Sequence, residues 1–181
     1  PDERAAVWDD LLASSLPDLH IVVPAANAAC RGAIDAEAPA GLANLHVLDG
    51  QAQQAMIASD AVLLASGTAA LEAMLCKRPM VVGYRLSGLT HAIVRTFGLL
   101  KVEHVSLPNV LAGEPLVPEL LQDDCTPERI AGALLPLLST PEPGLLLQAR
   151  FRDLHLMLRR DASERAADVI ADLLAPAEPV A

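Results

Sequence analysis

The sequence predicts an α/β fold in which a Rossmann-like parallel sheet is flanked by helices. Apolar runs of about four or five residues alternate with helical stretches of about ten, which is typical of βαβ units. The runs are apolar throughout, as expected for strands that are buried on both faces. Ligands of such sheets bind beyond the carboxyl ends of the strands, so the residues that follow each strand are the first candidates for a site.

The first half of the chain contains the clearest βα units. The expected strands are Leu19–Val23, Leu45–Leu48, Ala61–Ala65 and Met80–Tyr84. The expected helices are residues 2–15, Asn27–Ala38, Gln51–Ser59 and Thr68–Lys77. Prolines mark two of the boundaries: Pro17 ends the first helix, and Pro24 closes the first strand.

The second half is less regular. The pattern predicts a helix over Leu89–Leu100, an extended piece over Val105–Asn109 and a loop over residues 110–118. Thr126 as N-cap and Pro127 in the first turn predict a helix that ends near Leu138. Two further helices are expected: one carries Leu147, Phe151, Leu154 and Leu158 at helical spacing, and the other starts at Asp161 and ends near Leu174.

The composition excludes several classes of function. The 181 residues are 52% hydrophobic, which suits a packed core, and only 2% aromatic. The net charge of −10 repels a nucleic-acid backbone, and few aromatic side chains are available to stack on bases, so we expect no nucleic-acid partner. Cys30, Cys76 and Cys125 are widely spaced, which indicates reduced thiols in a cytosolic, soluble protein.

The turn Ser66-Gly67-Thr68 is the most informative stretch. It follows a buried strand and opens a helix, so its backbone N–H groups, with that of Ala69, form a natural phosphate site. Glu72 lies one turn into that helix, within reach of a sugar attached to the phosphate. A simple capped turn and a solvated carboxylate are the alternatives. The pattern suggests a nucleotide-sugar diphosphate site.

Other residues also follow strand ends. Asn27, Gly50 and Arg85 do so, and we expect them to share one rim of the sheet with Ser66. Each has a simpler interpretation as well. Asn27 could cap its helix, Gly50 could permit a turn, and Arg85 could be solvated.

Several longer segments resemble the lipid-A-disaccharide synthase family. They are Ile21–Ala28, Leu64–Glu72, Lys77–Val82, Val105–Gly113 and Val117–Gln122, and the resemblance covers nearly the whole chain. The family implies a GT-B glycosyltransferase with two Rossmann-like domains facing a cleft. Its members join UDP-2,3-diacylglucosamine to 2,3-diacylglucosamine 1-phosphate, giving the β-1,6-linked lipid A disaccharide precursor and UDP.

By this resemblance, residues 1–181 form the UDP-sugar donor-binding domain. The first strand of that domain and its Gly-Ser-Arg loop are expected to precede residue 1, and the terminal helices, about 143–174, to cross back toward the acceptor domain. The catalytic base is expected in that other domain, so we expect the chain alone to be inactive. No cofactor and no metal are expected, because the carboxylates form no Asp-x-Asp pair and the histidines have no metal-ligand spacing.

The resemblance also implies roles for particular residues and partners. Glu72 would accept hydrogen bonds from the ribose hydroxyls of UDP, and Asn109 would contact the donor or aid transfer as the catalytic candidate of this chain. The partners would be the UDP-sugar donor, an acylated glucosamine phosphate acceptor held by the other domain, and a second copy of the protein. The location would be the cytoplasm, at the inner membrane of a Gram-negative bacterium. Separately, the composition of Leu86–Lys101 resembles a basic amphipathic helix at a membrane surface, and a helix packed on its own sheet is the alternative.

Two alternatives remain open. One is half of another GT-B enzyme, such as a UDP-GlcNAc epimerase or a peptidoglycan glycosyltransferase. The other is a non-catalytic nucleotide-binding or interaction module, in which Leu147, Phe151, Leu154 and Leu158 would dock a partner.

Overall fold

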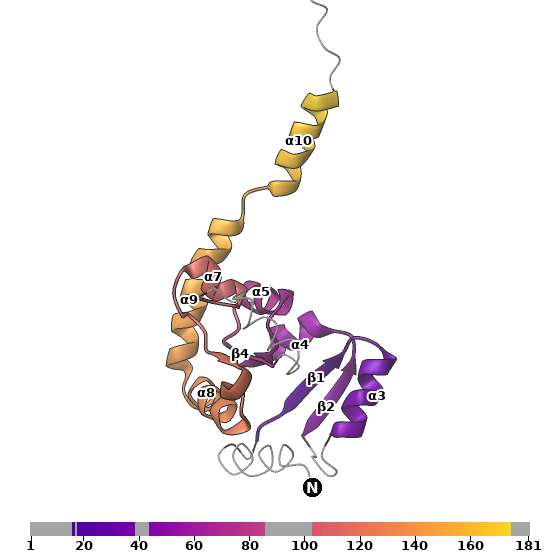
Figure 1. Ribbon diagram of the computed structural model, residues 1–181, viewed down its shortest axis with the longest axis vertical. Coiled ribbons are helices and arrows are strands. Elements are labelled where there is room, and N and C mark those ends of the chain that lie inside the picture. Colours follow the sequence, from indigo (N-terminus) through magenta and orange to yellow (C-terminus); the bar gives the residue numbers. More distant parts are fainter. Residues whose placement is uncertain (1–15, 17, 39–43, 86–102, 175–181) are drawn as a thin grey trace, which may run out of the picture.

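The computed structural model describes residues 16, 18–38, 44–85 and 103–174 (Figure 1). In this part of the chain all strand pairs are parallel, and they form two separate sheets. Strands β1 (Ile21–Ala25) and β2 (Leu45–Asp49) form one sheet. Strands β3 (Val62–Leu64), β4 (Met80–Tyr84) and β5 (Glu119–Leu121) form the other, in the order β3-β4-β5. The predicted parallel α/β fold is confirmed. The division of its described strands into two sheets was not predicted.

Helices connect and cover the strands. They are α3 (Ala28–Glu37), α4 (Ala52–Ala58), α5 (Thr68–Leu75), α7 (Leu107–Ala112), α8 (Pro127–Ser139), α9 (Pro141–Leu158) and α10 (Ala162–Leu174), with a 3-10 turn at Gln122–Asp124. The helices expected at residues 2–15 and Leu89–Leu100 lie outside the described residues. The start of α8 is confirmed: Thr126 caps it by accepting a hydrogen bond from the Arg129 N–H.

The first strand begins and ends two residues later than expected, so Pro24 lies inside it. Ile21 donates its N–H to Asn44, and Ala25 accepts from Gly50, so the odd-numbered residues of β1 bond to β2. The nitrogen of Pro24 therefore points away from β2, where its missing N–H breaks no ladder bond.

The extended piece expected over Val105–Asn109 is wrong, because its second half is helical. Helix α7 has a proline in its first turn, where the missing N–H costs nothing. It ends at Gly113, whose left-handed conformation (φ 67°) stops the helix. The loop expected over residues 110–118 therefore starts only at Gly113. Strand β5 was not expected at all, because three residues are too few to show a period.

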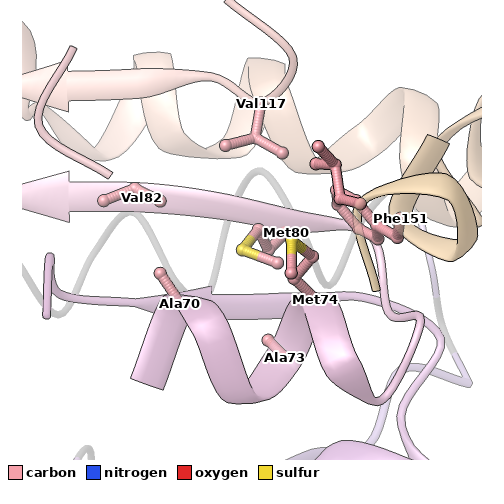
Figure 2. Close-up of a cluster of buried hydrophobic side chains, with 8 residues drawn as sticks. Ala70, Ala73, Met74, Met80, Val82, Val117 and Phe151 are labelled. Carbon is pink, nitrogen blue, oxygen red and sulfur yellow. The ribbon is translucent and has the colours of Figure 1, made fainter. Parts of the chain in front are cut away.

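Strand β4 is the centre of the larger core. Met80 and Val82 face α5 and α9, while Val81, on the opposite face, packs with Leu120 and Leu134. Figure 2 shows Phe151 of α9 next to Met74 and Met80; Ala70, Ala73, Val82 and Val117 belong to the same buried cluster. Phe151 is fully buried and Leu154 nearly so. The partner-docking stripe considered for α9 is thus wrong at these two positions, because they face the core of the same chain.

Helix α10 projects away from the rest of the molecule (Figure 1). None of its residues is buried, and Leu173 and Leu174 are 79% and 78% exposed. Within the described residues, no single helix is long and apolar enough to cross a bilayer, although Pro127–Ser139 and Pro141–Leu174, bent by 92°, would pass such a test together on length and composition.

Candidate functional site

The turn after β3 has the geometry of an anion site. Gly67 is the N-cap of α5 and has φ 156° and ψ −161°, a backbone conformation that is almost confined to glycine. In the part of the chain that the structure describes, the N–H groups of Thr68 and Ala69 have no protein acceptor. They lie in the first turn of the helix, where the macrodipole favours negative charge. The turn can therefore bind a phosphate through backbone donors.

Ser66 fixes one side of this turn. Its hydroxyl donates a hydrogen bond to the carbonyl oxygen of Val105 at 3.0 Å, and its side chain is half-buried. Because the hydroxyl proton is committed to Val105, only the oxygen lone pairs of Ser66 remain for another partner. Ser66 thus holds the turn in place, and the free donors come from the backbone and from Thr68, which is exposed.

Glu119 holds the segment around Val105, the residue whose carbonyl accepts the hydrogen bond from Ser66. Its carboxylate accepts the N–H of Val105 at 3.1 Å, the N–H of Ser106 at 2.8 Å and the side-chain amide of Asn109 at 2.9 Å. Three donors on one carboxylate form a cooperative network that fixes the Val105 carbonyl. The network links β5 to the turn after β3.

Asn109 is a buried member of this network, with only 1% of its surface exposed. Its amide nitrogen donates to the Val117 carbonyl and to Glu119, and its oxygen accepts the Val117 N–H at 2.8 Å. Both polar atoms are therefore occupied by the protein. This geometry favours a positioning role, and the catalytic role expected for Asn109 stays a prediction.

Glu72 lies at a small cavity between α4 and α5. The cavity, about 240 Å³, is lined by Gln53 and Ile57 of α4 and by Glu72, Leu75 and Cys76. Glu72 and Gln53 are both exposed, so a carboxylate and an amide are available there to hydroxyl groups. Gln53 was missed by the sequence analysis, because nothing local marks a glutamine in an exposed helix.

Asn27 and Gly50 lie on the rim of the smaller sheet. Asn27 caps α3 by accepting a hydrogen bond from the Cys30 N–H at 2.9 Å. Gly50 has φ 68° and donates its N–H to Ala25 at 2.7 Å, and Gln51 after it also has a positive φ. Among the described strands, no pairing joins this sheet to the larger one, and the expectation that Asn27 and Gly50 share a rim with Ser66 stays a prediction.

Arg85 follows β4 and is exposed. Because β3 and β4 are parallel, with Leu64 paired to Val82, Arg85 lies on the same rim as Ser66. Arg85 therefore brings a positive charge to the rim of the sheet at which α5 begins. Within the described ranges, no three His, Cys, Asp or Glu side chains gather in a metal-binding group.

Comparison with known proteins gives concordant matches. The family model described as Lipid-A-disaccharide synthetase matches residues 7–171. The chain is 53% identical over 176 residues to a lipid-A-disaccharide synthase of Xanthomonas campestris pv. campestris (strain 8004), covering 96% of this chain and 40% of that protein. It is 50% identical over 166 residues to a lipid-A-disaccharide synthase of Xylella fastidiosa (strain M23), covering 90% and 43%. The chain thus spans about two fifths of these relatives.

A solved structure has the same fold at low sequence identity. The glycotransferase of kitacinnamycin matches with a TM-score of 0.58 and 20% identity, covering 95% of this chain and 39% of that one. At this identity the likeness concerns the fold alone, and it agrees with a Rossmann-like parallel α/β architecture.

Proposed function

Because this chain belongs to the lipid-A-disaccharide synthetase family, we propose that it is the UDP-sugar-binding part of a glycosyltransferase of lipid A synthesis. The whole enzyme would join UDP-2,3-diacylglucosamine to 2,3-diacylglucosamine 1-phosphate, giving the β-1,6-linked disaccharide and UDP. The acceptor and the catalytic base would be held by the part of the enzyme that this chain does not span. We therefore expect no turnover from the chain alone.

The turn before α5 is the observation that carries this proposal. Cleavage of the sugar–phosphate bond leaves growing negative charge on the UDP leaving group. The backbone N–H groups of Thr68 and Ala69, preorganised by Gly67, would stabilise that charge without rearranging during the reaction. Arg85 on the same rim would offset part of the diphosphate charge.

The remaining donor contacts follow from the positions of the other residues. Glu72 and Gln53 would bind the ribose hydroxyls in the small cavity between α4 and α5. Asn27 and Gly50 would face the donor only if the rim of the smaller sheet closes on it. Asn109, through Glu119 and Val105, would act by holding Ser66 in place.

Calorimetry with UDP, UMP and ATP tests the donor site. We expect the chain to bind UDP in preference to the other two nucleotides, because the amides match a diphosphate and the Glu72 carboxylate matches a ribose. Glu72→Ala should weaken UDP binding about tenfold, since it removes charge-assisted hydrogen bonds. Glu128→Ala, at an exposed carboxylate in the first turn of α8, is the matched control and should leave UDP affinity unchanged.

Equal binding of the three nucleotides, or a Glu72→Ala variant with wild-type UDP affinity, would contradict this assignment. A chain without any nucleotide binding would instead favour an interaction module.

The proposal extends to partners and location. The acceptor would be an acylated glucosamine phosphate, and the enzyme would work in the cytoplasm at the surface of the inner membrane. The exposed apolar residues of α10 support either a crossover onto the acceptor domain or pairing with a second copy. Light scattering of the chain separates these possibilities, because only the second gives a dimer. The membrane role expected for Leu86–Lys101 concerns residues outside the described ranges.

A further inference from the structure

A second polar cavity lies at the opposite end of α5 from the donor turn. We call it the basic pocket; it is an open cavity of about 590 Å³ between Lys77, the residue that follows the α5 C-cap, and the stretch of α9 from its middle to its C-cap, Arg159. Its walls are formed by Lys77, Gln148, Ala149, Arg152, His155, Leu156 and Arg159. The α9 residues recur at spacings of three and four, so they share one face of that helix, next to the face that buries Phe151 and Leu154.

The charges of the basic pocket are of one sign. Among the described residues, no Asp or Glu lines it, although the whole chain carries a net charge of −10. The ion pairs of the described residues involve Arg31, Arg129 and Arg150, none of which lines the pocket. Asp153 follows Arg152 along α9 but is not part of the lining. Within the described ranges of the chain, three cations and an imidazole therefore share a concave surface that no carboxylate lines.

Lys77 makes two close polar contacts in this pocket. Its backbone has φ 60°, and its Nζ donates a hydrogen bond to the Leu75 carbonyl at 2.8 Å. Nζ also lies 2.7 Å from Nδ1 of His155. As a hydrogen bond, this contact makes Nδ1 the acceptor, which leaves the Nε2–H of His155 as a further donor. Burial lowers the pKa of Lys77, and nearby Arg152 lowers it further against an opposing effect of Cys76.

We propose that the basic pocket binds a phosphate group carried by a small molecule or by a lipid headgroup. Arginine offers paired N–H donors to phosphate oxygens, and lysine offers a compact point charge, so Lys77, Arg152 and Arg159 form a suitable set. The cavity is larger than a phosphate ion, and Leu156, whose side chain is exposed, forms an apolar part of its wall. The group attached to the phosphate therefore has room and an apolar surface beside it. This site is separate from the donor turn and does not rest on the proposed function.

Titration of the chain with inorganic phosphate, followed by NMR, tests the site. Saturable shifts are expected at the Lys77 amide and the His155 imidazole, which report on the basic pocket independently of the Ala69 amide in the donor turn. Arg152→Glu combined with Arg159→Glu should weaken the phosphate response at Lys77 about tenfold. Arg160→Glu combined with Arg165→Glu is the matched control, because it makes the same change in net charge at exposed residues outside the lining.

Vesicles distinguish the source of the phosphate. Cosedimentation with phosphatidylcholine vesicles that contain phosphatidylglycerol, lost in the pocket variant and kept in the control, would support a lipid headgroup. Phosphate saturation without vesicle binding would support a soluble phosphate ester. The milder Arg152→Gln with Arg159→Gln pair serves where the charge reversal disturbs folding, as judged by circular dichroism.

The proposal is overturned if phosphate gives no saturable response at Lys77 and the vesicles do not bind, or if both double variants lose binding equally. UDP calorimetry on the pocket variant keeps the two sites apart. UDP affinity should be unchanged by the pocket substitutions, and absent UDP binding would count against the donor site alone.

Discussion

At the scale of single residues, Gly67 carries the most specific constraint. A Cβ at this position would meet no atom within 4 Å, so the requirement for glycine comes from the backbone conformation rather than from space. The backbone conformation of Gly67 sets the direction of the N–H groups of Thr68 and Ala69. Because that conformation favours glycine, Gly67 allows the turn to expose these donors.

Gly67→Ala should lower the free energy of unfolding by about 1–3 kcal/mol, because alanine is strained at this φ and ψ. UDP affinity should fall as well, since relief of the strain would move the Thr68 and Ala69 amides. Urea denaturation and calorimetry measure the two effects. Gly132→Ala is the control: it lies in α8 with open space around it, and alanine should stabilise the helix by about 0.5–1 kcal/mol.

Glu119 is the second residue whose replacement is informative. Glu119→Ala removes the acceptor of two backbone N–H groups and of the Asn109 amide. Leaving such donors unpaired should cost about 1–3 kcal/mol of unfolding free energy, measured in urea. UDP binding should also weaken, because the Val105 carbonyl that holds Ser66 loses its support.

Glu119→Gln keeps one acceptor oxygen and should recover part of both losses. UDP affinity that is identical in Glu119→Ala and in the wild type would show that the network does not position the turn. The sequence marked Glu119 only as part of a longer resemblance, since its partners are up to 14 residues away along the chain.

At the scale of elements, caps and apolar periodicity in the sequence predicted most of the described helices, but the prediction for α7 was wrong. Val105–Asn109 reads as extended because α7, between its N-cap Ser106 and its C-cap Gly113, has only six residues. Strand β5 was missed for the same reason, as it is defined by its pairing with β4 rather than by a pattern of its own. Short elements depend on tertiary contacts, which periodicity does not record.

Helix α10 should contribute almost nothing to the stability of the rest of the molecule. A chain shortened after Arg160 loses this helix, in which no residue is buried, so its urea unfolding midpoint should match that of the full chain. Phe151→Ala, which empties a fully buried position of α9, is the contrasting control and should cost about 3–5 kcal/mol. A lower midpoint in the shortened chain would mean that α10 packs on the body or on a second copy.

At the scale of the whole molecule, proton binding links Lys77 to global stability. Its pKa is lower in the folded protein than its ordinary value of 10.5, so folding releases protons between the folded and unfolded values. The charged form is therefore unfavourable in the native state. Its cost is fully present at pH values below the folded pKa and disappears as the pH rises through 10.5.

Thermal unfolding from pH 8 upward checks this linkage. The wild type should gain stability relative to Lys77→Met as the pH rises toward 10.5, because only the wild type has the lysine to titrate. Lys77→Arg is the control, since its guanidinium stays charged over this range. A difference between wild type and Lys77→Met that stays constant with pH would contradict the lowered pKa.

The sequence by itself determined the alternation of strands and helices, the caps at Asn27 and Thr126, and the position of the Ser66-Gly67-Thr68 turn. These features depend on neighbouring residues, because caps, glycine turns and apolar runs act within a few positions of the chain. The tertiary structure alone decided that the strands divide into two sheets, that Glu119 and Asn109 support Ser66 through Val105, and that Lys77 meets α9 in the basic pocket. Those contacts join residues far apart in sequence, so they arise only when the chain packs around β4.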